Sequence, residues 1–221
     1  EMTKNAFHNL LHPFQPFIVG QRIIGPAMAK RFGVKLVMYG ENQAEYGNSI
    51  EENTNPIMDM DFFSSDDALS MKFGGVSMKE YIDMGYYTKD DFAPYIAPEK
   101  QDLIDAGIEV HYLGYYLNWD PQECYYYSVE NTGFQANPVR TEGTYSKYSS
   151  IDDKIDPFHY LTTLIKFGIG RCTYDAAQEV RNDKITREEA SYLVDKYDTE
   201  FPDIYFKEFL EYIDSTEDEF W

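Results

Sequence analysis

The sequence predicts an α/β fold in its first part and an all-helical region after it. Two short apolar runs, Leu36–Tyr39 and Ile108–Leu113, have the length and composition of buried parallel strands, and helical signals precede each of them. From about residue 156 onward the signals are helical only. We therefore expect two domains, an α/β domain over residues 1–137 and a helical region with a polar loop over residues 138–221.

The elements of the α/β domain follow from local signals. Pro26 weakens the first predicted helix unless it lies in the first turn, because proline removes a backbone donor. A long polar segment over residues 40–75 is expected to be irregular, and insertions of this length are often functional. The expected elements are a helix over 21–32 closed by Gly33, the strand at 36–39, a short helix behind Ser77 and Glu80, a helix over 98–106 closed by Gly107, and the strand at 108–113.

The helical region is also delimited by caps. Asp120-Pro121 opens its first helix, Asp156-Pro157 opens the next, and Thr186 with Glu189 forms a capping box. The expected helices cover 121–131, 158–167, 174–182, 187–197 and 202–213. A further capping box at Thr216 has no room for a helix behind it, and the chain starts at Glu1 rather than at a methionine. From this we expect a piece of a longer protein.

Composition and charge narrow the class of protein. Of the 221 residues, 43% are hydrophobic, which is enough for a substantial core. No run approaches the ~20 apolar residues that would span a bilayer. The net charge of −20 argues against a nucleic-acid groove, because phosphate contacts need clustered lysine and arginine. Cys124 and Cys172 lie far apart without CxxC spacing, so we expect a reduced, cytoplasmic protein.

A group of polar residues follows the first predicted strand. Gly40, Glu41, Asn42 and Glu45 come directly after the apolar run. Ligands of open α/β sheets bind beyond the carboxyl ends of strands, and Mg²⁺ prefers oxygen ligands shared with phosphates. These residues are therefore candidates for a nucleotide or metal site. The alternative is a solvated acidic loop, which is the more common outcome for such a pattern.

A second group lies in the loop between residues 134 and 155. Arg140 and Lys147 stand among hydroxyl side chains and a glycine, which together can surround an anion. Asp152 and Asp153 could ligate a metal or orient an amine. The alternative is a flexible solvated loop.

A third group is Gly168-Ile-Gly170-Arg171, between two predicted helices. With a helix start near Thr173, Arg171 could hold a phosphate together with the helical N–H groups. The alternative is a helix C-cap followed by a surface arginine. Of the four histidines, only His159 is kept as a distant acid–base candidate, and His111 is expected to be structural.

These groups belong to longer strings that resemble one family. The chain is similar to the N-acetyl sugar amidotransferases of surface-polysaccharide (lipopolysaccharide or O-antigen) biosynthesis, within the PP-loop ATP pyrophosphatases. The resemblance extends over essentially the whole chain, and it implies a Rossmann-like α/β sheet. The strings that carry it are Gly40–Glu45, Tyr112–Pro121, Glu130–Phe134, Arg140–Lys154, Lys166–Arg171 and Thr173–Glu189.

The resemblance implies a specific reaction. Such enzymes use ATP to adenylate the carbonyl oxygen of a sugar acetamido group, on a sugar or nucleotide sugar. Ammonia from a separate glutaminase subunit, passed through a cyclase-like partner, then displaces AMP and leaves an acetamidino sugar. On this basis Gly40, Glu41, Asn42 and Glu45 would face ATP, and Glu41 and Glu45 would hold Mg²⁺.

The resemblance also implies roles for the second and third groups. Lys147, Arg171 and Arg140 would hold phosphate or the sugar acid. Asp152 or Asp153 would position the metal or ammonia. The sequence departs from the family in one respect, because the Ser-Gly-Gly-x-Asp-Ser loop that cradles the pyrophosphate is absent. That loop and the first strands would lie upstream of Glu1, which leaves a partial Rossmann-like sheet here and makes activity of these 221 residues alone doubtful.

Two other functions stay open. The absent loop would also suit a non-catalytic piece that docks the glutaminase and the cyclase-like partner. A tRNA-modifying PP-loop relative is a weaker alternative, because the net charge is −20 and there is no CxxC pair.

Overall fold

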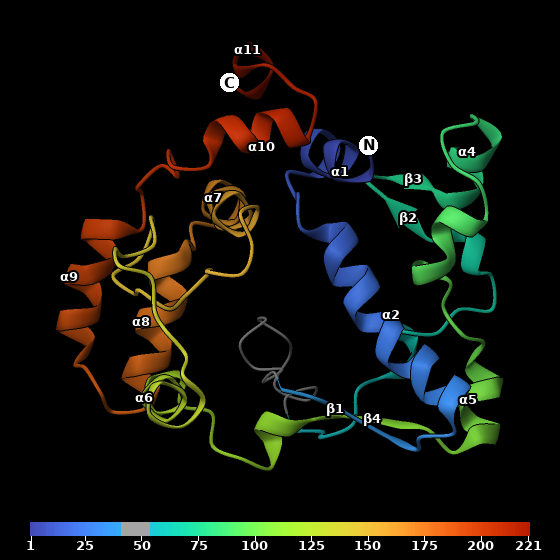
Figure 1. The fold of residues 1–221 in the computed structure, drawn as a ribbon, viewed down its shortest axis with the longest axis horizontal. Helices are drawn as coiled ribbons and strands as arrows, with labels where there is room; N and C mark the ends of the chain where they lie inside the picture. Colours follow the sequence, from blue (N-terminus) through green and yellow to red (C-terminus); the bar gives the residue numbers. More distant parts are fainter. Residues whose placement is uncertain (41–53) are drawn as a thin grey trace. The chain divides into compact units, whose positions relative to one another are not determined.

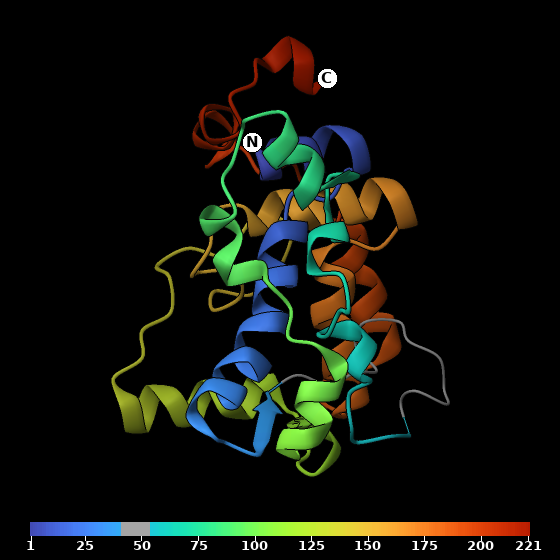
Figure 2. The same cartoon turned by 90° about the vertical axis from the view of Figure 1, so that its right-hand side faces the viewer.

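The computed structural model describes residues 1–40 and 54–221. These residues form two compact units, which we call unit 1 (residues 1–14 and 120–221) and unit 2 (residues 15–119). Both are visible in Figure 1 and, turned by 90°, in Figure 2. The fold is mixed α/β with a small parallel sheet and a helical C-terminal region, as the sequence predicts. The observed division differs from the expected boundary after residue 137.

Unit 2 is built around the two predicted strands. Strand β1 (Leu36–Tyr39) pairs in parallel with β4 (Glu109–Tyr112), so that Leu36 lies opposite Glu109. Helix α2 (Gln15–Phe32) precedes β1, and α5 (Lys100–Ala106) precedes β4. As predicted, α5 closes at Gly107, whose left-handed φ of 64° suits a residue without a side chain. The strands bury their inner face in a core that includes Ala29, Met58, Phe63, Leu103, Ile108, Val110 and Tyr112.

Helix α2 continues through Pro26, where the sequence predicts a break or a helix start. Proline cannot donate to the carbonyl four residues earlier, which here belongs to Arg22. The hydroxyl of Tyr39 replaces that donor, because its oxygen lies 3.0 Å from the Arg22 carbonyl and 2.8 Å from the Gln21 carbonyl. Gly25 lets β1 come this close, since a Cβ there would lie 3.2 Å from the Tyr39 hydroxyl. A tertiary contact thus removes the cost that the sequence pattern implied.

The rest of unit 2 is a hairpin and a short helix. Strands β2 (Lys72–Phe73) and β3 (Val76–Ser77) pair antiparallel across two glycines with positive φ. Helix α4 (Met78–Asp83) follows with the predicted capping box between Ser77 and Glu80. Short 3-10 turns occupy Met60–Phe62, Ala68–Ser70, Asp90–Tyr95 and Leu113–Tyr115.

Unit 1 is helical. The predicted helices are confirmed with small shifts of their ends, and two short helices were not expected. Helix α1 (Met2–Leu10) has no capping signal in the sequence. Helix α11 (Glu217–Phe220) corrects the expectation that nothing follows the capping box at Thr216, because that box caps a four-residue helix. The remaining helices are α6 (Pro121–Thr132), α7 (Asp156–Phe167), α8 (Arg171–Arg181), α9 (Arg187–Tyr197) and α10 (Phe206–Tyr212).

Packing explains why residues 1–14 belong to unit 1. Phe7 of α1 lies in an apolar cluster with Phe158, Phe209 and Ile213. The rings of Phe158 and Phe209 stack with their centroids 4.1 Å apart. These contacts join segments about 150 and 200 residues apart in the sequence, so a division read along the chain could not place α1.

Helix α6 is joined to the same unit by charge and aromatic contacts. Asp120 caps its N-terminus through the Glu123 N–H at 3.1 Å. Lys184, between α8 and α9, lies 3.0 Å from both Asp120 and Glu123. The Tyr125 ring stacks on Tyr148 at 4.4 Å. The division between the units therefore falls before Asp120 rather than after residue 137.

Two general expectations can be compared with the structure. Among the helices of residues 1–40 and 54–221, none combines the length and apolar character needed to cross a bilayer. Both cysteines are free thiols, with Cys172 buried and Cys124 exposed.

Candidate functional site

The loop that begins at Arg140 is anchored by a salt bridge inside unit 1. The guanidinium of Arg140 binds both carboxylate oxygens of Glu200 at 2.5 Å and stacks over the Tyr197 ring at 4.6 Å. The same carboxylate accepts the Gly143 N–H at 2.9 Å. The bond from Arg140 is the main reason that the pKa of Glu200 is lowered. Arg140 therefore already holds a carboxylate of its own chain.

The N-terminus of α8 is capped by Asp198. Its carboxylate accepts the N–H groups of Gly170 and Thr173 at 3.0 Å and the Thr173 hydroxyl at 2.7 Å. Gly170 has to be a glycine, because a Cβ there would lie 2.6 Å from an Asp198 oxygen. An internal carboxylate therefore occupies the Gly170 and Thr173 N–H groups at the start of α8, where the sequence suggested a phosphate.

Arg171 is a largely buried residue rather than a surface one, with 18% of its side chain exposed. Its Nε lies 3.2 Å from Asp175, one turn along α8, and its Nη1 lies 3.7 Å from Asp156. The guanidinium also stacks on the Tyr160 ring at 4.5 Å. Burial acts to lower the pKa of Arg171, but the charges of Asp175 and its other neighbours raise it overall. Within the described residues, Nε has no hydrogen bond of good geometry.

The carboxylates beside Arg171 are held by hydroxyl groups from the loop. Thr144 donates to Asp175 at 2.5 Å, and Ser150 donates to Asp156. Burial raises the pKa of Asp156, and Arg171 acts against that rise. The nearby charges of Asp152 and Asp153 add to it. The loop over 140–154 is thus folded around Arg171, as the pairing of the two predicted groups requires.

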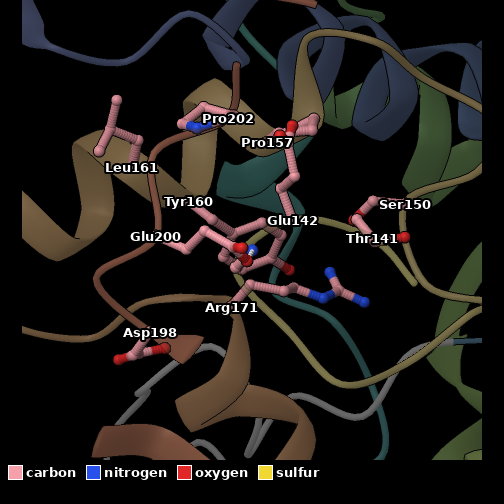
Figure 3. A pocket seen from close by; sticks show the side chains of 11 residues that line it. Thr141, Glu142, Ser150, Pro157, Tyr160, Leu161, Arg171, Asp198, Glu200 and Pro202 are labelled. Carbon is pink, nitrogen blue, oxygen red and sulfur yellow. Dashed lines mark hydrogen bonds between the residues drawn. The ribbon is translucent and has the colours of Figure 1, made fainter. Parts of the chain in front are cut away.

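Arg171, Tyr160 and Ser150 are among the residues that line a small cavity, which we call the Arg171 pocket (Figure 3). Its walls come from the loop over 141–150, from α7, from Arg171 and from residues 198–202 after α9. Figure 3 shows Arg171 extending toward the side where Thr141 and Ser150 lie. The free volume is about 10 Å³, room for roughly one water molecule. Its charged lining residues are three carboxylates, Glu142, Asp198 and Glu200, and one guanidinium.

The other predicted residues lie in different settings. Lys147 is exposed and donates only to the Pro138 carbonyl, at 3.2 Å. Asp153 accepts the Ile155 N–H at 2.6 Å just before α7, and Asp152 is exposed. Gly40 ends β1 in unit 2. Glu41, Asn42 and Glu45 lie outside the described residues.

The described residues contain no cluster of metal-ligating side chains. Over residues 1–40 and 54–221, there is no group of three or more histidine, cysteine or acidic side chains that could hold a metal ion. Around Arg171 the carboxylates are occupied by arginine and hydroxyl partners. The predicted ligands Glu41 and Glu45 are beyond the part of the chain that can be compared.

His159, the acid–base candidate, lies in an aromatic stack of unit 1. Its ring lies 5.1 Å from His12 and 5.4 Å from Phe14. Burial, followed by the charges of His12 and other cations, lowers the pKa of His159 to about 4. Among the described residues its Nδ1 has no hydrogen-bond partner. The imidazole is therefore neutral at pH 7, which suits a packed aromatic ring better than a proton donor.

Sequence reasoning missed the carboxylates that complete this site. Asp175 was within reach, because it follows Arg171 by four residues and so shares its helix face. Asp156 was interpreted only as a helix opener. Asp198 and Glu200 come from the end of α9 and show no local signal, since a capping carboxylate from a distant segment leaves no pattern near the helix that it caps.

One comparison with known proteins covers this part of the chain. Residues 142–221 match the family model described as "LPS biosynthesis protein WbpG-like, C-terminal domain". The matched segment contains Lys147, Asp152, Asp153 and Arg171. No curated protein matched the chain. The family match points to involvement in lipopolysaccharide biosynthesis.

Proposed function

We propose that the protein is part of an ATP-dependent amidotransferase that converts a sugar N-acetyl group to an acetamidino group in surface-glycan biosynthesis. The observation that carries this proposal is the match of residues 142–221 to a lipopolysaccharide biosynthesis domain. The resemblance of the longer strings to N-acetyl sugar amidotransferases supplies the reaction. Ammonia would come from a partner glutaminase through a cyclase-like subunit in the cytoplasm.

The chemistry explains why ATP is needed. An amide carbonyl is a poor electrophile, and adenylation turns its oxygen into a leaving group. Cationic side chains then stabilise the charge that develops on the pyrophosphate and on the departing AMP. In this proposal Lys147, Arg171 and Arg140 hold phosphate or a sugar acid, and Asp152 or Asp153 positions ammonia or metal. Glu41, Asn42 and Glu45 face ATP and Mg²⁺.

The contacts of the three cations rank them as ligand-binding groups. Arg140 and Arg171 each face carboxylates of their own chain, so a ligand would have to compete for them. Lys147 faces one carbonyl oxygen and is exposed. We therefore assign the first contact with an anionic substrate to Lys147, while Arg171 holds the loop in place in addition to its role toward phosphate or the sugar acid.

The test is a coupled assay of the full-length parent protein with the glutaminase, ATP, Mg²⁺ and a nucleotide-activated N-acetyl sugar. Amidine product is followed by mass spectrometry and AMP by chromatography. Lys147→Ala should reduce product formation by about tenfold, which corresponds to roughly 1.4 kcal/mol of transition-state stabilisation. The control is Lys207→Ala, a lysine whose side chain is 91% exposed. Full activity of Lys147→Ala would count against the assignment.

A second candidate function is a non-catalytic docking piece for the glutaminase and the cyclase-like partner. Two observations favour it: the Arg171 pocket has room for roughly one water molecule, and both arginines are paired internally. In that case ATP would leave the melting temperature of the protein unchanged while the glutaminase co-purifies with it. An ATP-dependent rise of the melting temperature together with amidine product would reject this candidate.

A further inference from the structure

The outer face of the two-stranded sheet in unit 2 carries a cavity of its own. Side chains alternate between the faces of a strand, so Leu36 and Met38 of β1 share this face with Glu109 and His111 of β4. Leu36 and Met38 are 51% and 43% exposed. The hollow is shallow and open to solvent, with a free volume of about 360 Å³, and its wall also includes Lys35 and Tyr116.

Three polar side chains form a hydrogen-bonded chain along this cavity. The Tyr116 hydroxyl lies 2.7 Å from His111 Nδ1, and His111 Nε2 lies 3.0 Å from Glu109 Oε2. An ionised carboxylate only accepts, so Nε2 carries the proton that it donates to Glu109. In a neutral ring Nδ1 is then the acceptor, and the Tyr116 hydroxyl donates to it. The order of groups is therefore phenol, base and orienting carboxylate.

The exposure of the three side chains agrees with these roles. The His111 side chain is only 14% exposed and has both ring nitrogens bonded, so its orientation is fixed. Tyr116, at the other end, is 50% exposed and faces the cavity. A reactive hydroxyl within hydrogen-bond reach of a base, with that base held by a third group, is the arrangement of an activated side chain.

We propose that Tyr116, His111 and Glu109 form an acid–base site for a hydroxyl compound that carries an anionic group. The substrate hydroxyl passes its proton to the Tyr116 oxygen as Tyr116 passes its own proton to His111 Nδ1. His111 becomes an imidazolium paired with Glu109, and the substrate oxygen gives up its proton only as it bonds to an electrophile, so that no free alkoxide has to form. Lys35 supplies the charge for the anionic group, because in residues 1–40 and 54–221 it has no ion-pair partner.

This site is independent of the proposed amidotransfer. It lies entirely in unit 2, whereas the Arg171 pocket lies in unit 1, and it needs no ATP. The proposal gives His111, which the sequence analysis expects to be structural, a second role, since its ring links an exposed phenol to a carboxylate. Glu109 acts through His111 and is a positioning residue.

The test is the rate at which N-acetylimidazole acetylates individual tyrosines, read by peptide mass spectrometry. The acetyl group moves to the phenol oxygen while His111 takes the phenol proton, which then passes to the departing imidazole, so the relay should accelerate the reaction. Tyr115 is a matched internal control because it is adjacent and 53% exposed. Tyr116 should react about tenfold faster than Tyr115, a modest value for general base catalysis.

Variants and a ligand show whether a high acetylation rate of Tyr116 comes from the relay or only from its exposure to solvent. His111→Gln should bring the Tyr116 rate down to that of Tyr115. Glu109→Gln, at a side chain that is 61% exposed and therefore safe for folding, should lower it several-fold. Glycerol 3-phosphate should protect Tyr116 but not Tyr115, and Lys35→Gln should remove the protection. Equal rates in the unmodified protein, or a ratio unchanged in Glu109→Gln, would overturn the relay. If glycerol 3-phosphate did not protect Tyr116 from acetylation, the proposed class of ligand, a hydroxyl compound with an anionic group, would be wrong.

Discussion

Polar side chains are paired with each other in the Arg171 pocket of unit 1, whereas on the outer sheet face of unit 2 they end at an exposed group. In unit 1 the arginines that the sequence offers to a ligand are paired with carboxylates of the same unit. In unit 2 the chain from Glu109 to Tyr116 ends at a half-exposed hydroxyl beside a larger cavity. The pocket marked by the richer sequence motif is therefore the more closed of the two.

The difference shows how charge is used in an acidic chain. With a net charge of −20, cations are scarce, and a buried guanidinium is stabilised by the carboxylates around it. Arg171 thus organises α7, α8 and the 140–154 loop before any ligand is present. The sheet face needs no such neutralisation, because its charged groups, Glu109 and Lys35, are exposed to solvent.

The largest expected effect comes from removing the buried cation. Arg171→Ala leaves Asp156 and Asp175 without their partner, and breaking a buried pair on one side costs about 3–5 kcal/mol of unfolding free energy. The measurement is urea unfolding followed by Trp221 fluorescence in a Trp119→Phe background, because Trp221 lies in unit 1. Arg181→Ala, an exposed arginine of the same helix, should change the free energy by less than about 0.5 kcal/mol.

The loss of unfolding free energy caused by Arg171→Ala should also depend on pH. Burial already raises the pKa of Asp156, so without Arg171 this carboxyl can become neutral more readily as the pH falls. The cost should be smaller at pH 5 than at pH 7. A loss below 1 kcal/mol at pH 7 would contradict the view that Arg171 holds unit 1 together.

A second, smaller effect concerns His159. Its pKa is lowered from 6.5 to about 4 in the folded protein, so folding disfavours its protonated form. The corresponding stability is complete above pH 6.5 and is lost as the pH falls from 6.5 toward 4. At about 1.4 kcal/mol per pKa unit, the loss at pH 4 approaches roughly 3 kcal/mol.

The measurement is the urea midpoint of unit 1 between pH 7 and pH 5, where carboxylates with lowered pKa values stay ionised. His159→Phe should flatten this part of the profile, because an aromatic ring without a titratable group fills the same stack. An identical slope in both proteins would exclude His159 as the source.

The smallest effects contrast two glycines, one in each unit. Gly170→Ala places a Cβ 2.6 Å from Asp198 and disturbs the α8 cap, so we expect a loss of about 2 kcal/mol. Gly40→Ala meets no atom of the described residues within 4 Å and should change the stability by less than about 0.5 kcal/mol. Trp221 fluorescence reports the first variant and Trp119 fluorescence the second. Equal effects would remove the contrast between a crowded and an open position.

Much of the fold could be predicted because its signals are local. The capping boxes at Ser77 and Thr186 and the glycine after α5 mark helix ends through groups only a few residues away. The two apolar runs became the paired strands β1 and β4. The predicted helix over 21–32 is confirmed within α2 despite Pro26, and the Tyr39 hydroxyl that replaces the missing donor could not be foreseen because it lies on another element.

The candidate site was predicted less completely. The approach of the 140–154 loop to Arg171 is in the structure, but Lys147 points to a backbone carbonyl and Arg140 to Glu200. Glu200 and Asp198 could not be found from the sequence. Acidic residues after a helix are common, and no neighbouring residue indicates which distant group such a carboxylate binds. The roles of Glu41, Asn42 and Glu45 stay predictions.

By itself, the sequence determined where most helices and strands begin and end, the acidic balance of the chain, and the strings that resemble sugar amidotransferases. These properties depend on residue type and on neighbours within a few positions. Only the tertiary structure decided that α1 belongs with the C-terminal helices, that Asp198 occupies the start of α8, and that Arg171 is buried between two carboxylates. A charged side chain is stabilised by whichever opposite charge the fold brings within a few ångströms, and that partner is set by packing between distant segments.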